Sequence, residues 1–207
     1  MSVLDKLLAL LGLRTLTDSL VMLHKANPVD LYVDHDGSGL GELEELLNFI
    51  VEASRGRIRL RVSESREGFT ELPSPRIRIG GALENRIAYY GRLSEPLLPI
   101  ILEALLIAGG AYTPSCPSSR ITEEARLRLY VVTGIPCIIA GVYAVDLLSC
   151  WPSVRLEVVN IETSRSLASR VGNVPAFEYK GRIFLRGAPR SLEFLAENIR
   201  RVIGHAA

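Results

Sequence analysis

Apolar residues gather along the chain in short segments, and their spacing switches between the period of a strand and that of a helix. The same order of elements occurs twice. The first half predicts strands at 29–34, 57–62, 76–79 and 86–91, and helices at 40–54 and 95–108. The second half predicts strands at 127–132, 154–159, 176–179 and 182–185, and helices at 137–150, 164–170 and 191–203. The charged stretch 122–126 between the halves is interpreted as a short helical turn.

Local sequence supports this internal repeat. The matched pairs are Leu-Tyr-Val at 31–33 and 129–131, Pro75 and Pro175 ahead of a strand, and segments 86–91 and 182–187 ahead of the closing helix. Each half therefore has a β-α-β unit, a hairpin and a helix. The long crossover makes the first two strands of each half parallel neighbours. We predict an α/β fold of two domains, each a four-stranded mixed sheet flanked by helices.

The predicted domains cover residues 1–112 and 124–207, with a linker at 113–123 that is rich in proline and serine. The composition fits a globular protein, with 48% hydrophobic and 23% charged residues in a chain of 207. A net charge of +1 indicates neither nucleic-acid binding nor attraction to a membrane surface.

The longest apolar run, 97–111, is too short for a membrane span and contains Glu103, so we interpret it as a buried helix. The apolar start of the chain lacks the pattern of a signal peptide, and the expected location is the cytoplasm. Lysine occurs only three times among 24 basic residues, a bias that hints at a thermophilic source.

Cysteine occurs at only three positions, Cys116, Cys137 and Cys150. An odd and sparse count is not typical of a secreted disulfide scaffold. One internal disulfide is compatible with a hyperthermophilic source.

The repeated pattern resembles that of the archaeal protein disulfide oxidoreductases, which are tandem thioredoxin folds. It is also similar to the N-terminal double-thioredoxin domain of alkyl hydroperoxide reductase flavoprotein subunits. The resemblance covers about residues 20–202, and its markers are the segments 73–75, 90–91, 108–110 and 173–176. It implies two thioredoxin-like domains and a thiol-disulfide oxidoreductase ancestry, glutaredoxin-like in type.

The resemblance also implies a redox dithiol in the second domain, and this chain lacks it. Thioredoxins place a proline before the second cysteine of C-G-P-C. Aligning on Pro136 puts this motif on Gly134-Ile135-Pro136-Cys137, so that Gly134 replaces the nucleophilic cysteine. In the other frame Cys137 is the first cysteine and Ala140 stands at the second. Both frames leave one thiol missing, and the sequence does not decide between them.

The chemistry of disulfide exchange needs two sulfurs, because one thiolate attacks and the second resolves the mixed disulfide. Cys137 is predicted at a helix N-terminus, where a thiol can be activated. It is interpreted as a buried remnant of an ancestral site, with residual reactivity as the alternative. Cys150 is expected at the far end of the same helix, too distant to resolve Cys137. Whether Cys116 on the linker pairs with Cys137 stays open.

The resemblance further implies cis peptide bonds at Pro75 and Pro175. In the family, the backbone at this proline lines a groove in which a substrate strand forms main-chain hydrogen bonds. A purely structural turn is the alternative. Pro175 is therefore a candidate site residue beside Cys137.

Segment 34–45 also has the spacing of a calcium-binding loop. Positions 1, 3, 5, 6 and 12 of such a loop are filled by Asp34, Asp36, Ser38, Gly39 and Glu45. Gly41 stands where an apolar residue is usual, and a strand precedes the loop in place of a helix. We interpret the segment as an acidic loop capping a helix and predict no tight calcium binding. No second histidine lies near His35 in sequence, and no metal or cofactor is predicted.

These observations predict a degenerate oxidoreductase relative that acts as a protein- or peptide-binding module. The alternative is a residual thiol-disulfide oxidoreductase that uses the single Cys137. Protein or peptide partners are expected, and nucleic acids and membranes are not.

Overall fold

The computed structural model describes residues 2–37, 40–65, 69, 71–118 and 121–204. Two short helices precede the repeated units: α1 (Val3–Leu10) and α2 (Leu16–Leu23). The first unit consists of β1 (Val29–His35), α3 (Leu40–Ala53), β2 (Ile58–Glu64), β3 (Arg76–Ile79), β4 (Ile87–Tyr90) and α4 (Leu98–Ala108), with short 3-10 turns at Gly81–Leu83 and Glu95–Leu97. The second unit consists of β5 (Ala125–Val131), α5 (Ile135–Cys150), β6 (Val154–Asn160), α6 (Arg165–Val171), β7 (Ala176–Tyr179), β8 (Arg182–Arg186) and α7 (Leu192–Gly204).

All eight strands form one mixed sheet in the order β2-β1-β3-β4-β6-β5-β7-β8. Each unit contributes four strands, as predicted, with a parallel first pair and an antiparallel hairpin. The two sheets join edge to edge, because β4 pairs in parallel with β6 from Ile87↔Leu156 to Tyr90↔Val159. This pairing removes two exposed strand edges and fixes the units side by side.

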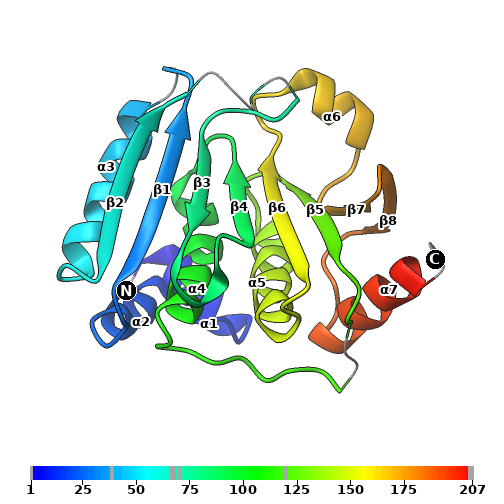
Figure 1. The fold of residues 1–207 in the computed structure, drawn as a ribbon, viewed down its shortest axis with the longest axis horizontal. Coiled ribbons are helices and arrows are strands. Elements are labelled where there is room, and N and C mark those ends of the chain that lie inside the picture. Colours follow the sequence, from blue (N-terminus) through cyan, green and yellow to red (C-terminus); the bar gives the residue numbers. More distant parts are fainter. Residues whose placement is uncertain (1, 38–39, 66–68, 70, 119–120, 205–207) are drawn as a thin grey trace.

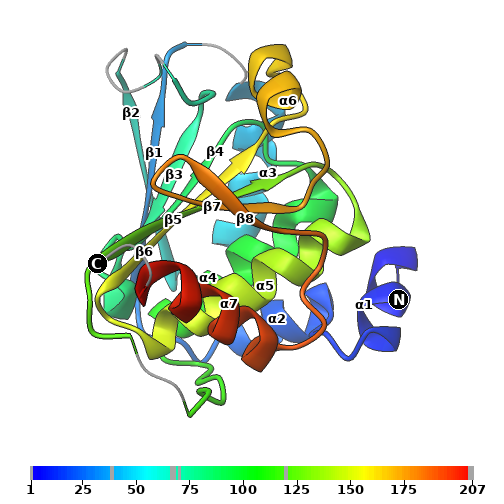
Figure 2. The same cartoon turned by 90° about the vertical axis from the view of Figure 1, so that its right-hand side faces the viewer.

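The two faces of the sheet are covered very differently (Figures 1 and 2). Helices α1 to α5 and α7 lie on one face and bury the large hydrophobic core against it. On the other face, α6 covers only one end, over a smaller core built around the side chains of Tyr90, Tyr130, Val159 and Leu167. The rest of that face, which we call the open face, has no helix over it in either view.

Helices α4 and α5 pack closely against each other and join the two units on the covered face. Gly141 permits this approach: a Cβ atom there would lie only 2.3 Å from Cδ1 of Ile100. Every residue of α4 is buried, including Glu103, which agrees with the interpretation of this run as a buried helix. Within the described part of the chain, no helix has both the length and the apolar character needed to cross a membrane.

Stretch 122–126 is not helical, and that prediction is wrong. Strand β5 begins at Ala125, two residues earlier than its apolar pattern predicts. Ala125 and Leu127 face the core, while Arg126 is exposed and Arg128 is half-buried. The charged residues at the start of β5 belong to a strand with a period of two, in which Arg126 and Arg128 lie on the open face.

Candidate functional site

The helix α5 places Cys137 at the third position of its first turn. Gly134 is the N-cap, and its carbonyl oxygen accepts hydrogen bonds from Cys137 N (3.0 Å) and Ile138 N (3.1 Å). Pro136 fits the second helical position because the N–H groups of the first turn have no partner within the helix. The segment 134–137 therefore forms the start of the helix, and a side chain at position 134 would face Cys137, the third helical residue.

The thiol of Cys137 is buried, with 2% of the residue exposed. Its Sγ accepts a hydrogen bond from Val132 N at 3.4 Å. Burial raises the pKa of this thiol, and this outweighs the opposite effect of the Val132 hydrogen bond. A thiol that is both buried and neutral is a poor nucleophile.

Gly134 itself has free space on its Cβ side, where the nearest atom is Cδ of Pro136 at 3.9 Å. Its φ of 166° is extended backbone, which any residue can adopt. Ala140, the residue of the competing frame, is fully buried in α5. The two frames thus place the missing sulfur in contrasting environments: position 134 is open, and position 140 is enclosed.

Pro175 lies beside this helix start because of the register of β5 and β7. Tyr130 pairs with Ala176, so Pro175 comes level with Val131, next to the residue that donates to the Cys137 sulfur. The peptide bond before Pro175 is cis, as is the one before Pro75. The carbonyl oxygen of Pro175 accepts a hydrogen bond from Gly187 N at 2.8 Å. Gly134, Cys137 and Pro175 therefore gather at one end of the sheet.

Loops from both units enclose the same end of the sheet. Asn160 Nδ2 donates to the carbonyl oxygen of Arg92 (2.7 Å), and the hydroxyls of Ser94 and Thr133 lie 3.1 Å apart. Glu162 accepts a hydrogen bond from Thr133 N, just before Gly134. Burial would raise the pKa of Glu162, but the hydrogen bonds from Thr133 outweigh it and lower that pKa.

Sequence reasoning did not identify Asn160 or Glu162 as part of this end of the sheet. Their only signal is a polar residue on each side of Ile161, at the end of strand β6, whose last residue is Asn160. Gly91 marks the same junction. With φ at 90°, it lies where a Cβ atom would be 2.7 Å from the carbonyl oxygen of Asn160.

The other two cysteines form a disulfide at the opposite end of α5. Cys116 of the linker is bonded to Cys150, 34 residues later, and Cys137 is the free cysteine. The open question of a Cys116–Cys137 pair is thereby answered, since Cys116 has a different partner. Closing a loop of this length stabilises a folded chain by about 4 kcal/mol in the chain-entropy account. The disulfide holds the linker against the second unit and supplies no second sulfur to Cys137.

The equivalent end of the first unit is built from ion pairs. Asp34 accepts hydrogen bonds from Ser63 Oγ (2.7 Å) and Arg76 Nε (2.9 Å), and its Oδ2 lies 3.2 Å from Arg78. His35 is buried, and its Nδ1 accepts a hydrogen bond from Gly37 N. Asp34, the first residue of the calcium-like spacing, is thus paired with two arginines on the sheet.

Two residues of that spacing, Ser38 and Gly39, lie outside the described residues. In the described part of the chain, no group of three or more His, Cys, Asp or Glu side chains is arranged to hold a metal ion.

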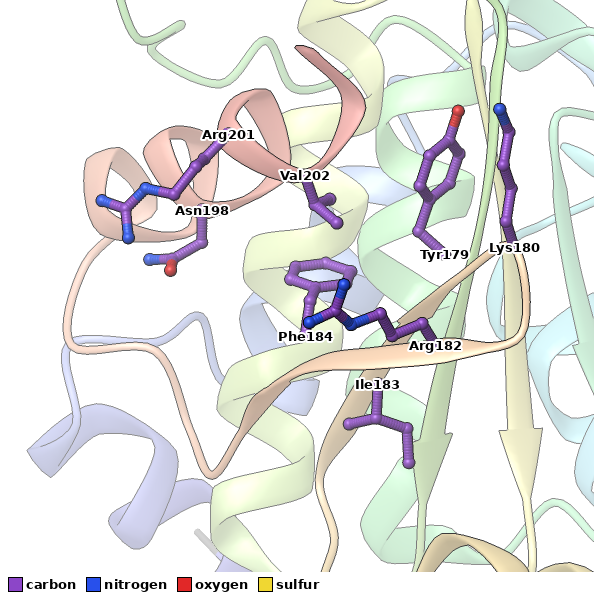
Figure 3. A pocket seen from close by; sticks show the side chains of 8 residues that line it. All are labelled: Tyr179, Lys180, Arg182, Ile183, Phe184, Asn198, Arg201 and Val202. Atoms are coloured by element: carbon purple, nitrogen blue, oxygen red, sulfur yellow. The ribbon is translucent and has the colours of Figure 1, made fainter. Parts of the chain in front are cut away.

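A separate pocket of about 450 Å³ lies between β8 and α7, away from Cys137 (Figure 3). Phe184 and Val202 face each other across it, and Lys180 and Arg182 project from the hairpin side. Asn198 also lines it, and its amide donates to the backbone of α7 at Phe194. Its lining residues include no cysteine and no carboxylate.

Comparisons with known proteins identify the fold. No family model and no curated protein matches the chain. The NTD_N/C domain of alkylhydroperoxide reductase AhpF from Enterococcus faecalis aligns with 87% of this chain and 95% of its own, at 16% identity and a TM-score of 0.72. A protein disulfide oxidoreductase from Aeropyrum pernix aligns with 91% and 92%, at 16% identity and a TM-score of 0.65. Sso1120 from Sulfolobus solfataricus aligns with 83% and 96%, at 12% identity and a TM-score of 0.59.

At sequence identities of 12% to 16%, these structural matches establish similarity of fold alone. The chain has the two-unit α/β fold that the internal repeat predicted and the tandem thioredoxin-like form that the resemblance implied, and it covers nearly the whole length of each of the three matched chains.

Proposed function

We propose that this chain is a thioredoxin- and glutaredoxin-like protein of the disulfide oxidoreductase type that has lost its dithiol and acts as a protein- or peptide-binding module. One observation carries the proposal: Gly134 occupies the helix N-cap position, and the only free cysteine in the described chain is buried three residues later. A protein of this kind can hold a polypeptide beside Pro175, in the groove that the family resemblance implies there, without exchanging a disulfide with it.

The alternative, a residual oxidoreductase that uses Cys137 alone, is disfavoured by burial. The thiolate is the attacking species, and burial raises the pKa of Cys137.

We also propose that the protein is located in the cytoplasm of a thermophile. Intracellular disulfides such as Cys116–Cys150 persist in hyperthermophilic organisms.

The Cys137 thiol is expected to be unreactive in the folded protein. A disulfide reagent such as 5,5′-dithiobis(2-nitrobenzoic acid) at pH 8 should label it at least about 100-fold more slowly than glutathione, because attack requires an exposed thiolate. In 6 M guanidinium chloride one thiol should react per chain, and Cys137→Ser should remove it. Rapid labelling of the native protein would support the residual-enzyme alternative.

Binding in the groove is expected to be blocked by a bulky side chain at Gly134. Position 134 has free space, so Gly134→Phe should fold and fill the groove. The ligand is carboxymethylated α-lactalbumin, an unfolded polypeptide without free thiols. It should shift the amide NMR signals of Gly134 and Val174 in the wild type, and Gly134→Phe should weaken binding at least about tenfold, equal to 1.4 kcal/mol.

Gly41→Phe is the matched control, because that glycine in α3 of the first unit likewise has open space at its Cβ position, with no atom within 4 Å. The control should bind like the wild type. Equal binding by all three proteins, or signal changes confined to other surfaces, would contradict a binding role for this groove.

A further inference from the structure

The open face of the sheet carries more basic than acidic side chains, unlike the rest of the chain. The side chains of β1, β2, β3, β5, β6 and β7 that face away from the helical layer include seven arginines and four carboxylates: Arg59, Arg61, Arg76, Arg78, Arg126, Arg128, Arg155, Asp30, Asp34, Glu157 and Glu178. The whole chain has 24 basic and 23 acidic residues, so the remainder, with 17 and 19, is net negative. The positive charge is therefore concentrated on the face that no helix covers.

The carboxylates of this face lie beneath the arginines. Glu157 and Glu178 have 12% and 9% of their side chains exposed and pair with Arg128. Arg126 has 69% of its side chain exposed and lies 3.9 Å from Glu157, too far for a hydrogen bond. Among the charged strand residues around Arg126, the arginine is therefore far more exposed than the carboxylates that it neighbours.

Two hollows meet at Arg126. One, of about 380 Å³, extends along Arg155 and Ser153, and the other, of about 420 Å³, extends along Arg128 and Arg170. Glu124 lines both hollows and Glu84 lines the first, but the six basic side chains of the combined lining outnumber the four acidic ones. Both include Arg126, so together they cross from β6 over β5 towards β7.

Arg126 and Arg155 are also direct neighbours across the sheet. They are register partners on the parallel strands β5 and β6, and both are exposed. Like charges opposite each other destabilise a sheet. An anion bound between them would relieve this repulsion.

We propose that the open face around Arg126 and Arg155 is a docking surface for an acidic segment of a partner protein. Guanidinium groups pair with carboxylates through two parallel hydrogen bonds. A second copy of the chain is unsuited to this surface, because two faces with the same excess of positive charge repel each other. The site lies on the outer face of the sheet and is separate from the groove beside Pro175.

Single-stranded nucleic acid is the less suitable anion. Its sequence-independent binding uses exposed aromatic rings on which bases stack. Here Tyr130 is fully buried and its hydroxyl donates to Glu178, and Arg78 lies over the ring of Tyr32. The face thus offers charge without a stacking platform, which favours carboxylates on a peptide.

The test uses fluorescein-labelled decaglutamate as the ligand and fluorescence anisotropy as the readout. The wild type should bind it in 20 mM salt and release it in 500 mM salt, because salt screens exposed charges. Arg126→Thr/Arg155→Thr should weaken binding at least about tenfold, equal to 1.4 kcal/mol. Threonine is favourable in strands, and both residues are exposed, so the variant should keep the melting temperature of the wild type.

The matched control is Arg200→Gln/Arg201→Gln, which removes the same charge from two exposed positions of α7. The control and the groove variant Gly134→Phe should both bind decaglutamate like the wild type. Equal weakening in the two double variants, no binding by the wild type, or tighter binding of decathymidylate than of decaglutamate would overturn the proposal.

Discussion

Substituting Gly134→Cys is expected to give this chain a slow dithiol-disulfide exchange activity that the wild type lacks. The new cysteine would stand at the N-cap of α5, where its side chain points towards the third residue of the helix. That residue is Cys137, so the pair would have the spacing of a C-x-P-C motif. The space at position 134 is open, and no neighbouring atom has to move.

The two sulfurs would have different roles, set by their surroundings. The helix N-terminus stabilises a thiolate at position 134, so its pKa should lie below the free value of about 8.5. Cys137 would resolve the mixed disulfide from inside the protein. Burial raises the pKa of Cys137, which should make resolution the slow step.

Insulin reduction with dithiothreitol measures this gain. Gly134→Cys should exceed the wild type at least about tenfold, and adding Cys137→Ser should abolish the gain, because no resolving thiol remains. Ala140→Cys is the control for the competing frame, and its fully buried position should leave it inactive. Turnover by the wild type, or rescue by Ala140→Cys alone, would contradict the proposed loss of the nucleophile at Gly134.

The repeated strands and helices could be predicted because each has a clear local period. The bounds of β3 and β7, at Arg76–Ile79 and Ala176–Tyr179, agree with the sequence prediction. Helix α1 could not be predicted as readily, because apolar residues such as Val3 and Leu10 remain exposed on it and blur its amphipathic pattern.

Contacts between the two units could not be predicted from local sequence patterns. The pairing of β4 with β6 joins residues about 70 positions apart in sequence, and it brings Arg92 to Asn160. The partner of Cys116 depends in the same way on the path of the linker to the end of α5. Residue types and spacing identified Gly134 and Cys137, but only the fold shows that one is open and the other buried.

A buried pair of acids between the units is expected to make stability fall as the pH rises. Asp146 of α5 and Glu103 of α4 are both buried, and Glu103 forms an ion pair with Arg14. The guanidinium of Arg14 also lies 3.9 Å from the centre of the Tyr112 ring. One oxygen of Asp146, Oδ1, is buried without a hydrogen-bond partner. Burial, followed by the charge of Glu103, raises the pKa of Asp146 to about 8.

The sign of the effect follows from proton binding. Between pH 4 and pH 8 the folded protein keeps the proton of Asp146, whereas the unfolded chain, with a carboxyl pKa of about 3.9, has released it. Since the folded state binds more protons, the free energy of unfolding decreases as the pH rises through this range. The full loss is about 6 kcal/mol, for a pKa difference of about 4 units (from about 3.9 to about 8) at 1.36 kcal/mol each.

Other carboxylates act in the opposite direction at lower pH. Burial alone would raise the pKa of Asp34, but the hydrogen bonds from Ser63 and Arg76 outweigh it and hold that pKa below its ordinary value. Its stabilising contribution is lost only as the pH falls through that lowered pKa. The range from pH 5 to pH 8 therefore lies above the titration of such carboxylates, and the difference between the wild type and a variant of Asp146 across it isolates the contribution of Asp146.

Asp146→Asn should remove this pH dependence, because asparagine has nearly the same shape and no proton to lose. Urea unfolding at pH 5, 6, 7 and 8 should give a nearly constant free energy of unfolding for the variant and a falling one for the wild type, so that the variant is the more stable protein at pH 8. Glu103→Gln should behave differently, since it leaves Arg14 without its carboxylate and should destabilise the protein at every pH. Parallel curves for the wild type and Asp146→Asn would mean that Asp146 is already ionised in the folded protein at pH 5.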